Sequence, residues 1–490
     1  MRRRIALAIS LALVTAVVPL LGQTSAAPVS VDPRVGVALE VVRVWLEGQR
    51  AYDQIPGISA AVVYDQDPLW AGGYGLADLA TKRPADADTV YSICSISKLF
   101  TSVAAMQLRD AGKLRLDDPV AKHLPWFAIK RTPPDGPEIT IEGLLTHASG
   151  LPREADAPYW TEATFPTHDQ IVAGLRSQET LYRAEEYFQY SNLGLTLAGE
   201  IVAAEANMPY ADYVHRSIFE PLGLRHTTPE MPEAERGKHL ATGYSGMTRA
   251  GARRPAPFFQ ARGIAPAAGY ASTVGDLGRF ASWQFRLLAR GGSEVLNANT
   301  LREMHRVHFV DPDFETTWGL GFSVIRRDGK SFVGHGGSCP GFQTELLLKL
   351  DEKVATVLMA NAQGVNTQLW AYRMYEIIAP AIRAAKKEPE KAKALDPDLD
   401  RYLGSYEGAP FFSGEVAVVR WEDGLALLSL PTLDPVKNLT KLKKVGEHRF
   451  RRIRSDESLG EEIVFEMGRD GKAARFTRHN NYYPRVKSPT

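Results

Sequence analysis

The four residues Ser95-Ile96-Ser97-Lys98 set the first expectation about this chain. Residues three apart on a helix are neighbours, so this spacing places the Lys98 amine within reach of the Ser95 hydroxyl. A serine hydroxyl is a poor nucleophile until a base takes its proton, which an adjacent amine can do. Apolar residues at helical spacing follow the pair and predict a mostly buried helix that stops near Gly112. An N-cap serine followed by a surface lysine has the same spacing, so the pair needs partners elsewhere in the chain.

Two downstream stretches offer such partners. Tyr190-Ser191-Asn192 precedes a predicted helix, and a phenol near a lysine can relay protons; the alternative is a tyrosine packed at a capped helix start. Gly334-His335-Gly336-Gly337-Ser338 lies on a predicted strand, where paired glycines suit the close approach of another backbone or a ligand. A β-bulge or turn is the alternative there, and neither stretch is decisive alone.

Composition excludes some classes of partner. The chain has 490 residues, of which 44% are hydrophobic and 23% are charged, as expected for a globular protein of two or three domains. Its 58 basic and 57 acidic residues leave a formal net charge of +1, so no overall field favours nucleic acid or anionic lipid. We therefore expect no nucleic-acid partner.

Residues 1–26 have the pattern of a secretory signal peptide. Three arginines precede the apolar run from Ile5 to Leu21, and small residues follow it. A membrane anchor is the alternative, since the run approaches the length needed to cross a bilayer, but the small residues favour cleavage. No later stretch is long and apolar enough to cross a membrane. We expect a secreted or periplasmic protein without stable membrane insertion after cleavage.

Periodicity along the rest of the chain predicts an α+β fold. Helices come first and last with antiparallel strands between them, which argues against a parallel doubly wound sheet. The principal predicted helices cover 35–50, 139–145, 192–204, a segment starting near 272 and the region around 370–378. The predicted strands of this half cover 57–64, 70–76, 318–325, 331–334, 344–350 and 355–360. Residues 152–180 and 226–266 are expected to be irregular, and the charged residues 386–398 a linker before a β-rich tail.

Together and in this order, the three motifs resemble those of the serine β-lactamase and penicillin-binding-protein superfamily, specifically its class C β-lactamase-related branch of esterases and peptidases. Further stretches resemble the same branch: Leu144–Leu151, Phe219–Leu224, Ala268–Thr273 and Trp318–Phe322. The resemblance implies a β-lactamase/transpeptidase-like domain at 31–385, in which helices flank an antiparallel sheet and an all-helical region adjoins it. The tail at 399–490 is similar to the small all-β, lipocalin-like domain often appended to this branch.

The resemblance implies a reaction through an acyl-enzyme. Ser95 would attack a carbonyl, and Lys98 and Tyr190 would move the proton, with either of them as the base. The backbone N–H groups of Ser95 and Ser338 would form the oxyanion hole. The substrate-binding residues it implies are Asn192, His335, Gly336, Gly337 and Ser338. No metal or cofactor is expected, and His305 and His308 lack the pattern of a zinc site.

His335 departs from the family pattern, in which a lysine begins this motif. A histidine is mostly neutral at pH 7, so the permanent cation that holds a substrate carboxylate is missing. From an unperturbed pKa near about 6.5, we expect His335 to gain its charge within pH 5 to 8. Efficient β-lactam hydrolysis is not expected, and an ester, amide or D-amino-acid peptide is favoured. Fragments of the cell wall are among the candidate substrates.

The two cysteines of the chain are Cys94 and Cys339, one before the nucleophile and one after the glycine pair. In the implied fold their segments lie side by side, and some class A carbapenemases are similar in carrying a bridge there. Export would supply an oxidising compartment, so we predict a disulfide rather than two buried thiols.

Two functions are compatible with these residues. The first is a secreted serine hydrolase acting on esters or peptides. The second is a non-hydrolytic penicillin- or peptidoglycan-binding protein whose acyl-enzyme persists. The rate of deacylation distinguishes these two functions, and no sequence motif indicates that rate.

Overall fold

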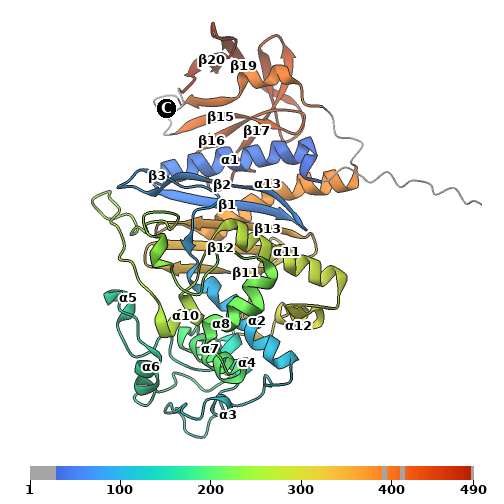
Figure 1. Ribbon diagram of the computed structural model, residues 1–490. Helices are drawn as coiled ribbons and strands as arrows, with labels where there is room; N and C mark the ends of the chain where they lie inside the picture. Colours follow the sequence, from blue (N-terminus) through green and yellow to red (C-terminus); the bar gives the residue numbers. More distant parts are fainter. Residues whose placement is uncertain (1–28, 389–393, 409–413, 487–490) are drawn as a thin grey trace, which may run out of the picture.

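The computed structural model describes residues 29–388, 394–408 and 414–486. The proposed signal peptide, residues 1–26, and part of the proposed linker lie outside these ranges. Figure 1 shows the layers from top to bottom: a β-rich C-terminal body, a pair of helices, a large sheet and a helical region. Within the described ranges, no helix is both long and apolar enough to cross a membrane.

The large sheet is antiparallel throughout, which confirms the predicted α+β class. Its strand order is β3-β2-β1-β13-β12-β11-β10-β9-β8. The strands are β1 Gly57–Tyr64, β2 Asp67–Asp78, β3 Arg83–Pro84, β8 Phe309–Val310, β9 Thr317–Trp318, β10 Ser323–Arg327, β11 Lys330–Cys339, β12 Phe342–Lys349 and β13 Val354–Ala360. Strand β1 is rich in Ile, Ala and Val and is buried, because helices cover both faces of the sheet.

Helices α1 (Pro33–Tyr52) and α13 (Thr367–Lys387) cover one face of the sheet. Apolar side chains of both helices and of that face form one core, in which the Trp45 and Trp370 rings lie 5.7 Å apart. Helix α11 (Val274–Arg290) packs on the opposite face, and its N-cap is Thr273.

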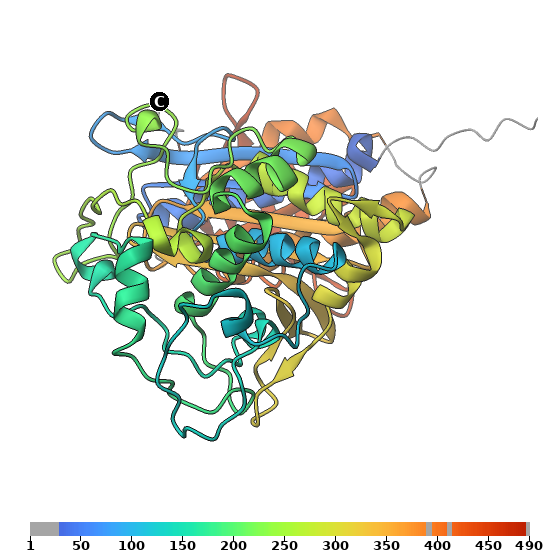
Figure 2. The same ribbon diagram turned by 60° about the horizontal axis from the view of Figure 1, so that its bottom comes forward.

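The helical region surrounds α2 (Ser97–Asp110), which is buried along most of its length. In Figure 2 this light-blue helix lies between the sheet and the green helices. The other helices of the region are α3 Val120–His123, α4 Ile141–Thr146, α5 Tyr159–Glu162, α6 His168–Leu175, α7 Asn192–Ala206, α8 Tyr210–Val214, α9 Glu220–Leu222, α10 Ala265–Ala268 and α12 Ala298–Met304. Two small ladders, β4 Tyr91–Ser92 with β5 Ala271–Ser272 and β6 Ser293–Glu294 with β7 Leu296–Asn297, complete the body.

The C-terminal body is a nearly closed antiparallel barrel, as expected for the tail. Its strands are β14 Gly404–Glu407, β15 Glu415–Trp421, β16 Gly424–Leu430, β17 Leu439–Gly446, β18 Arg449–Ile453, β19 Leu459–Met467, β20 Ala473–Arg478 and β21 Asn481–Pro484. A bridge between Tyr406 and Arg485 brings the first and last strands together. The barrel sits on α1, where Trp45 Nε1 donates to the Thr432 carbonyl at 2.9 Å. It shares the α1–α13 core, so it is packed on the first domain rather than merely tethered to it.

Two expectations about secondary structure were wrong. The predicted strand 318–325 is two strands, because Gly319 and Gly321 form a turn whose backbone packs too closely on Met304 and Ser102 for a side chain. The segment 152–180 is not wholly irregular, since it contains α5 and α6. The capping box between Thr167 and Gln170 marks the start of α6 and was readable in the sequence.

Candidate active site

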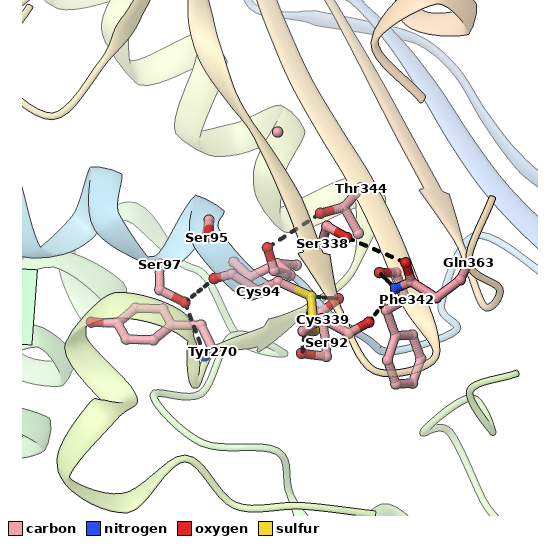
Figure 3. Close-up of a disulfide and its surroundings, with 12 residues drawn as sticks. Ser92, Cys94, Ser95, Ser97, Tyr270, Ser338, Cys339, Phe342, Thr344 and Gln363 are labelled. Atoms are coloured by element: carbon pink, nitrogen blue, oxygen red, sulfur yellow. Dashed lines mark hydrogen bonds between the residues drawn. A yellow bond between two sulfur atoms is a disulfide. The ribbon is translucent and has the colours of Figure 1, made fainter. Parts of the chain in front are cut away.

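Ser95 lies in a single 3-10 turn, Cys94–Ile96, that leads directly into α2. Cys94 has a left-handed backbone conformation, with a φ of 49°, so the chain turns sharply just before Ser95. The Ser97 hydroxyl donates to the Cys94 carbonyl at 2.5 Å and accepts from the Tyr270 N–H at 3.0 Å (Figure 3). Ser97 therefore holds the turn in place, and Ser95 is the hydroxyl left to react.

Lys98 is fully buried and has three oxygen neighbours. Its Nζ lies 3.1 Å from Ser95 Oγ, 2.7 Å from Asn192 Oδ1 and 2.7 Å from the Ala267 carbonyl oxygen. Burial lowers the pKa of Lys98 well below its usual value, although the Glu154 charge opposes this shift. A neutral amine directs its two N–H groups at Asn192 and Ala267, which can only accept, and its lone pair at Ser95. This is the geometry of a base for the Ser95 proton.

Glu154 sets the orientation of the Asn192 amide. Asn192 Nδ2 donates to the two Glu154 carboxylate oxygens at 2.8 and 3.0 Å, which leaves Oδ1 toward Lys98. The Tyr159 hydroxyl also donates a short hydrogen bond to Glu154, and burial raises the pKa of Tyr159 so that it remains a donor. A chain of hydrogen bonds thus runs from Tyr159 through Glu154 and Asn192 to the Lys98 amine.

Tyr190 lies beside Ser95 and Lys98 and packs against two aromatic rings. Its ring centroid lies 4.8 Å from Lys98 Nζ, 4.3 Å from the His147 ring and 6.1 Å from the Trp318 ring. Burial raises the pKa of Tyr190, and an interaction with the Ser95 hydroxyl partly offsets this. A neutral phenol at this position can donate a proton to the group that leaves the carbonyl carbon attacked by Ser95.

His147 holds the loop under Tyr190. Its Nδ1 accepts from the Ser191 N–H at 3.1 Å, and its carbonyl accepts from the Gln189 N–H at 2.8 Å. Burial lowers the pKa of His147 well below its usual value, so the ring is neutral. The two histidines considered for metal binding are separately engaged, His305 with Gln284 and His308 with Glu142.

Gly337 allows β11 to run against the nucleophile turn. A Cβ atom there would lie 2.3 Å from the Ile93 carbonyl oxygen and 2.3 Å from Thr344 Oγ1. The register of β11 against β12 is unbroken from Val333 to Cys339, so the bulge alternative is wrong. The close backbone approach expected from the paired glycines is confirmed.

The predicted disulfide between Cys94 and Cys339 is present (Figure 3). Their Cα atoms lie 5.7 Å apart. Ser95 and Ser338, the two residues whose N–H groups are expected to form the oxyanion hole, each adjoin one half of this bridge. The bridge therefore ties the nucleophile turn to the strand that faces it.

His335 lies where the motif predicted, but its expected titration is wrong. The side chain is 4% exposed, its ring lies 5.4 Å from that of Trp318, and Nδ1 donates to the Gly336 carbonyl at 2.5 Å. Burial lowers the pKa of His335 to about 3, and the Lys98 charge acts in the same direction. His335 is therefore neutral throughout pH 5 to 8, and its buried Nε2 has no hydrogen-bond partner among the described residues.

These groups meet at a cleft of about 710 Å³. Its lining is Ser95, Arg153, Tyr190, Trp318, Ser323, His335, Gly336, Gly337, Ser338, Gln343, Thr344 and residues 364–368. Lys98 and Asn192 lie behind this surface, both buried. All of these lining residues belong to the first domain, and no described residue of the C-terminal barrel lines the cleft.

Sequence reasoning missed Arg153, Glu154 and the Ala267 carbonyl. Arg153 and Glu154 follow directly on the Leu144–Leu151 stretch that had been recognised, and their charge at that place was the available signal. The Ala267 carbonyl carries no side-chain signal at all. The other residues expected at the site lie at this one cleft. Lys98 and Asn192 lie behind its surface, and the residues in its lining are Ser95, Tyr190, His335, Gly336, Gly337 and Ser338.

Comparisons with known proteins agree with this architecture. A family model described as Beta-lactamase matches residues 43–377. Protein flp of Staphylococcus aureus (strain COL) is 25% identical over 351 residues, which cover 68% of this chain and 67% of that protein. Unguisins hydrolase ungD' of Aspergillus campestris (strain IBT 28561) is 27% identical over 363 residues, covering 71% of this chain and 66% of that protein.

Among solved structures, the octameric penicillin-binding protein homologue from Pyrococcus abyssi superimposes with a TM-score of 0.61 at 24% identity. The superposition covers 91% of this chain and 99% of that one, so the likeness in fold extends into the C-terminal barrel.

Proposed function

The chain belongs to the β-lactamase family of serine hydrolases, and we propose that it is an exported enzyme that cleaves an ester, amide or D-amino-acid peptide bond through an acyl-enzyme on Ser95. The observation that carries the proposal is the position of the buried Lys98 amine, 3.1 Å from the Ser95 hydroxyl with its two N–H groups already engaged.

In the proposed reaction, Lys98 accepts the proton of the Ser95 hydroxyl as Oγ bonds to the substrate carbonyl carbon. The carbonyl oxygen becomes an oxyanion, which the N–H groups of Ser95 and Ser338 stabilise. When the tetrahedral intermediate collapses, the leaving group takes a proton from Tyr190, which is restored by Lys98. Water then attacks the ester on Ser95, releases the acid and returns the proton to the serine.

The cleft supports a substrate other than a β-lactam. His335 is a neutral side chain where the family pattern has a permanent cation, so a carboxylate at that point gains no charge attraction. Weak or absent β-lactamase activity follows. A penicillin-binding protein with a persistent acyl-enzyme is the alternative outcome, and the rate of deacylation distinguishes the two.

Export is part of the proposal. It is supported by the signal-like residues 1–26 and by a buried disulfide next to the nucleophile, since such bonds persist in oxidising compartments.

The test is labelling with a neutral fluorophosphonate, followed by turnover of a p-nitrophenyl ester, a D-alanyl peptide and a cephalosporin. We expect Ser95 to be labelled and the Ser95→Ala variant not to be. We expect steady turnover of the ester or the peptide, slow turnover of the cephalosporin, and a loss of about 100-fold or more in Tyr190→Phe. A stoichiometric burst without turnover on every substrate would favour the binding protein, and wild-type labelling of Ser95→Ala would remove Ser95 from the mechanism.

A further inference from the structure

Arg153 is a charged side chain in the lining of the cleft at Ser95. Among the described residues, the lining contains no lysine, aspartate or glutamate. His335 adds no charge above about pH 4, because burial lowers its pKa to about 3. A substrate that enters the cleft therefore meets a single permanent positive charge, and it comes from the loop before α7 rather than from β11.

The backbone of Arg153 is fixed while its guanidinium is accessible. Its carbonyl accepts from the N–H groups of Asn192 and Leu193 at 2.7 and 3.2 Å, which anchors it to the first turn of α7. The side chain is 60% exposed, and its Cζ lies 4.9 Å from the Tyr190 ring centroid. The stacking on Tyr190 brings the charge next to a residue that itself adjoins Ser95.

The two terminal nitrogens of Arg153 are unoccupied. Only Nε donates a hydrogen bond, to Glu154 Oε1 at 3.1 Å, and neither Nη contacts an acceptor within the described part of the chain. Two parallel N–H groups of a guanidinium match the two oxygens of a carboxylate. The two terminal nitrogens of Arg153 can therefore bind a planar anion.

Glu154 does not prevent Arg153 from binding an anion. Its oxygens already accept from Asn192 Nδ2 and from the Tyr159 hydroxyl, and Glu154 is absent from the cleft lining. An exposed ion pair held by one hydrogen bond is weak in water, so Arg153 can hold a second carboxylate at its other edge.

We propose that Arg153 selects substrates that carry a carboxylate close to the scissile ester or amide bond. The proposal rests on the proposed function of Ser95. In the family pattern the cation lies on the strand, whereas here the cation is Arg153 on the opposite, helical side of the cleft. The preferred anion therefore lies toward Tyr190 and Arg153 rather than along β11.

The test compares matched esters in the wild-type protein and in Arg153→Gln and Arg153→Lys. One pair places the carboxylate on the acyl side: the mono-p-nitrophenyl ester of adipic acid and its methyl ester. The other pair places it on the leaving group: 4-butyryloxybenzoate and its methyl ester. The ratio of kcat/KM for the charged and neutral member of each pair removes any general effect of the substitution on Tyr190.

We expect the wild-type ratio to exceed that of Arg153→Gln by roughly 10-fold or more in one pair, the size typical of a charge-assisted hydrogen bond. Arg153→Lys should retain part of the preference, and added salt should reduce it in the wild type. Arg176→Gln, at an exposed arginine outside the cleft, is the matched control and should leave both ratios unchanged. The pair that responds identifies which side of the bond carries the anion.

Equal ratios in the wild type and Arg153→Gln for both pairs would overturn the selection by Arg153 while leaving a working hydrolase. If Ser95 reacts with neither the neutral ester nor a neutral fluorophosphonate, the proposed function fails and the selection fails with it.

Discussion

Cys94 and Cys339 are covalently joined, so the residue before Ser95 is tied to the residue after Ser338. The bridge closes a loop of 245 residues and crosses from the helical region to the sheet. It links the two segments that must keep a constant spacing if both N–H groups are to reach one oxygen atom. Stability and catalysis are therefore expected to respond to it together.

Removing the bridge should lower both the melting temperature and the rate. The chain-entropy treatment gives an upper limit on the order of 5 kcal/mol for so long a loop. We expect Cys94→Ala/Cys339→Ala to melt at lower temperature and to lose kcat more than substrate affinity. Since the chain has 2 cysteines, a reductant should mimic the double substitution in the wild type and do nothing further to the variant. Two free thiols in the denatured, unreduced protein would contradict the prediction.

Glu154→Gln should slow the reaction and shift its pH dependence. Loss of a charged acceptor loosens the Asn192 amide, with an expected drop in kcat/KM of roughly 10-fold for a neutral ester. The Glu154 charge raises the pKa of Lys98, so removing the charge lowers that pKa further. The acid limb of the pH–rate profile, where Lys98 becomes protonated, should therefore move to lower pH.

The control for this shift is Glu162→Gln, at an exposed glutamate on the neighbouring helix α5. It should change neither the rate nor the profile. A slower Glu154→Gln enzyme with an unmoved acid limb would mean that Glu154 acts only through packing.

Gly337→Ala should separate β11 from the nucleophile turn. The added methyl would meet the Ile93 carbonyl oxygen and Thr344 Oγ1 at 2.3 Å, and the backbone atom cannot swing aside. We expect a loss of about 100-fold in kcat/KM, as for an oxyanion site displaced by about 1 Å, and a stability loss of about 1–3 kcal/mol. Gly246→Ala is the matched control, because its nearest neighbouring atom would be 3.8 Å away. Equal rates in the two variants would show that the close approach is not needed.

The parts of the site that the sequence predicted are those with a local or motif signal. Ser95 and Lys98 are one helical turn apart, and that spacing alone brings them together. Tyr190 and the Gly336-Gly337 pair were found through ordered motifs, since nothing local says that they meet Ser95. Glu154 and Arg153 had no assigned role, because each acquires one only where its loop docks on the start of α7.

The errors have the same origin in tertiary packing. The segment from Trp318 to Ile325 has the composition of a strand, but the turn at Gly319 is imposed by α12 and the backbone of Met304. The pKa of His335 was taken from its value in water, and only the packed sheet and the neighbouring Lys98 reveal the shift. The contact between the barrel and α1 was not predicted, because it depends on surfaces that periodicity does not distinguish.

His335 should make the protein less stable in acid without affecting its choice of substrate at pH 5 to 8. Its pKa is about 3 when folded and about 6.5 when unfolded, so the unfolded chain binds the extra proton and stability falls as pH drops from about 6.5 to about 3. The shift corresponds to an upper limit of roughly 5 kcal/mol. The melting temperature of His335→Asn should therefore fall less than that of the wild type between pH 7 and 4, and the exposed His239→Asn should follow the wild type.

The preference for carboxylated esters should stay constant from pH 5 to 8, because Arg153 remains charged and His335 neutral throughout. A preference that rises toward pH 5 would show that His335 titrates in the cleft after all.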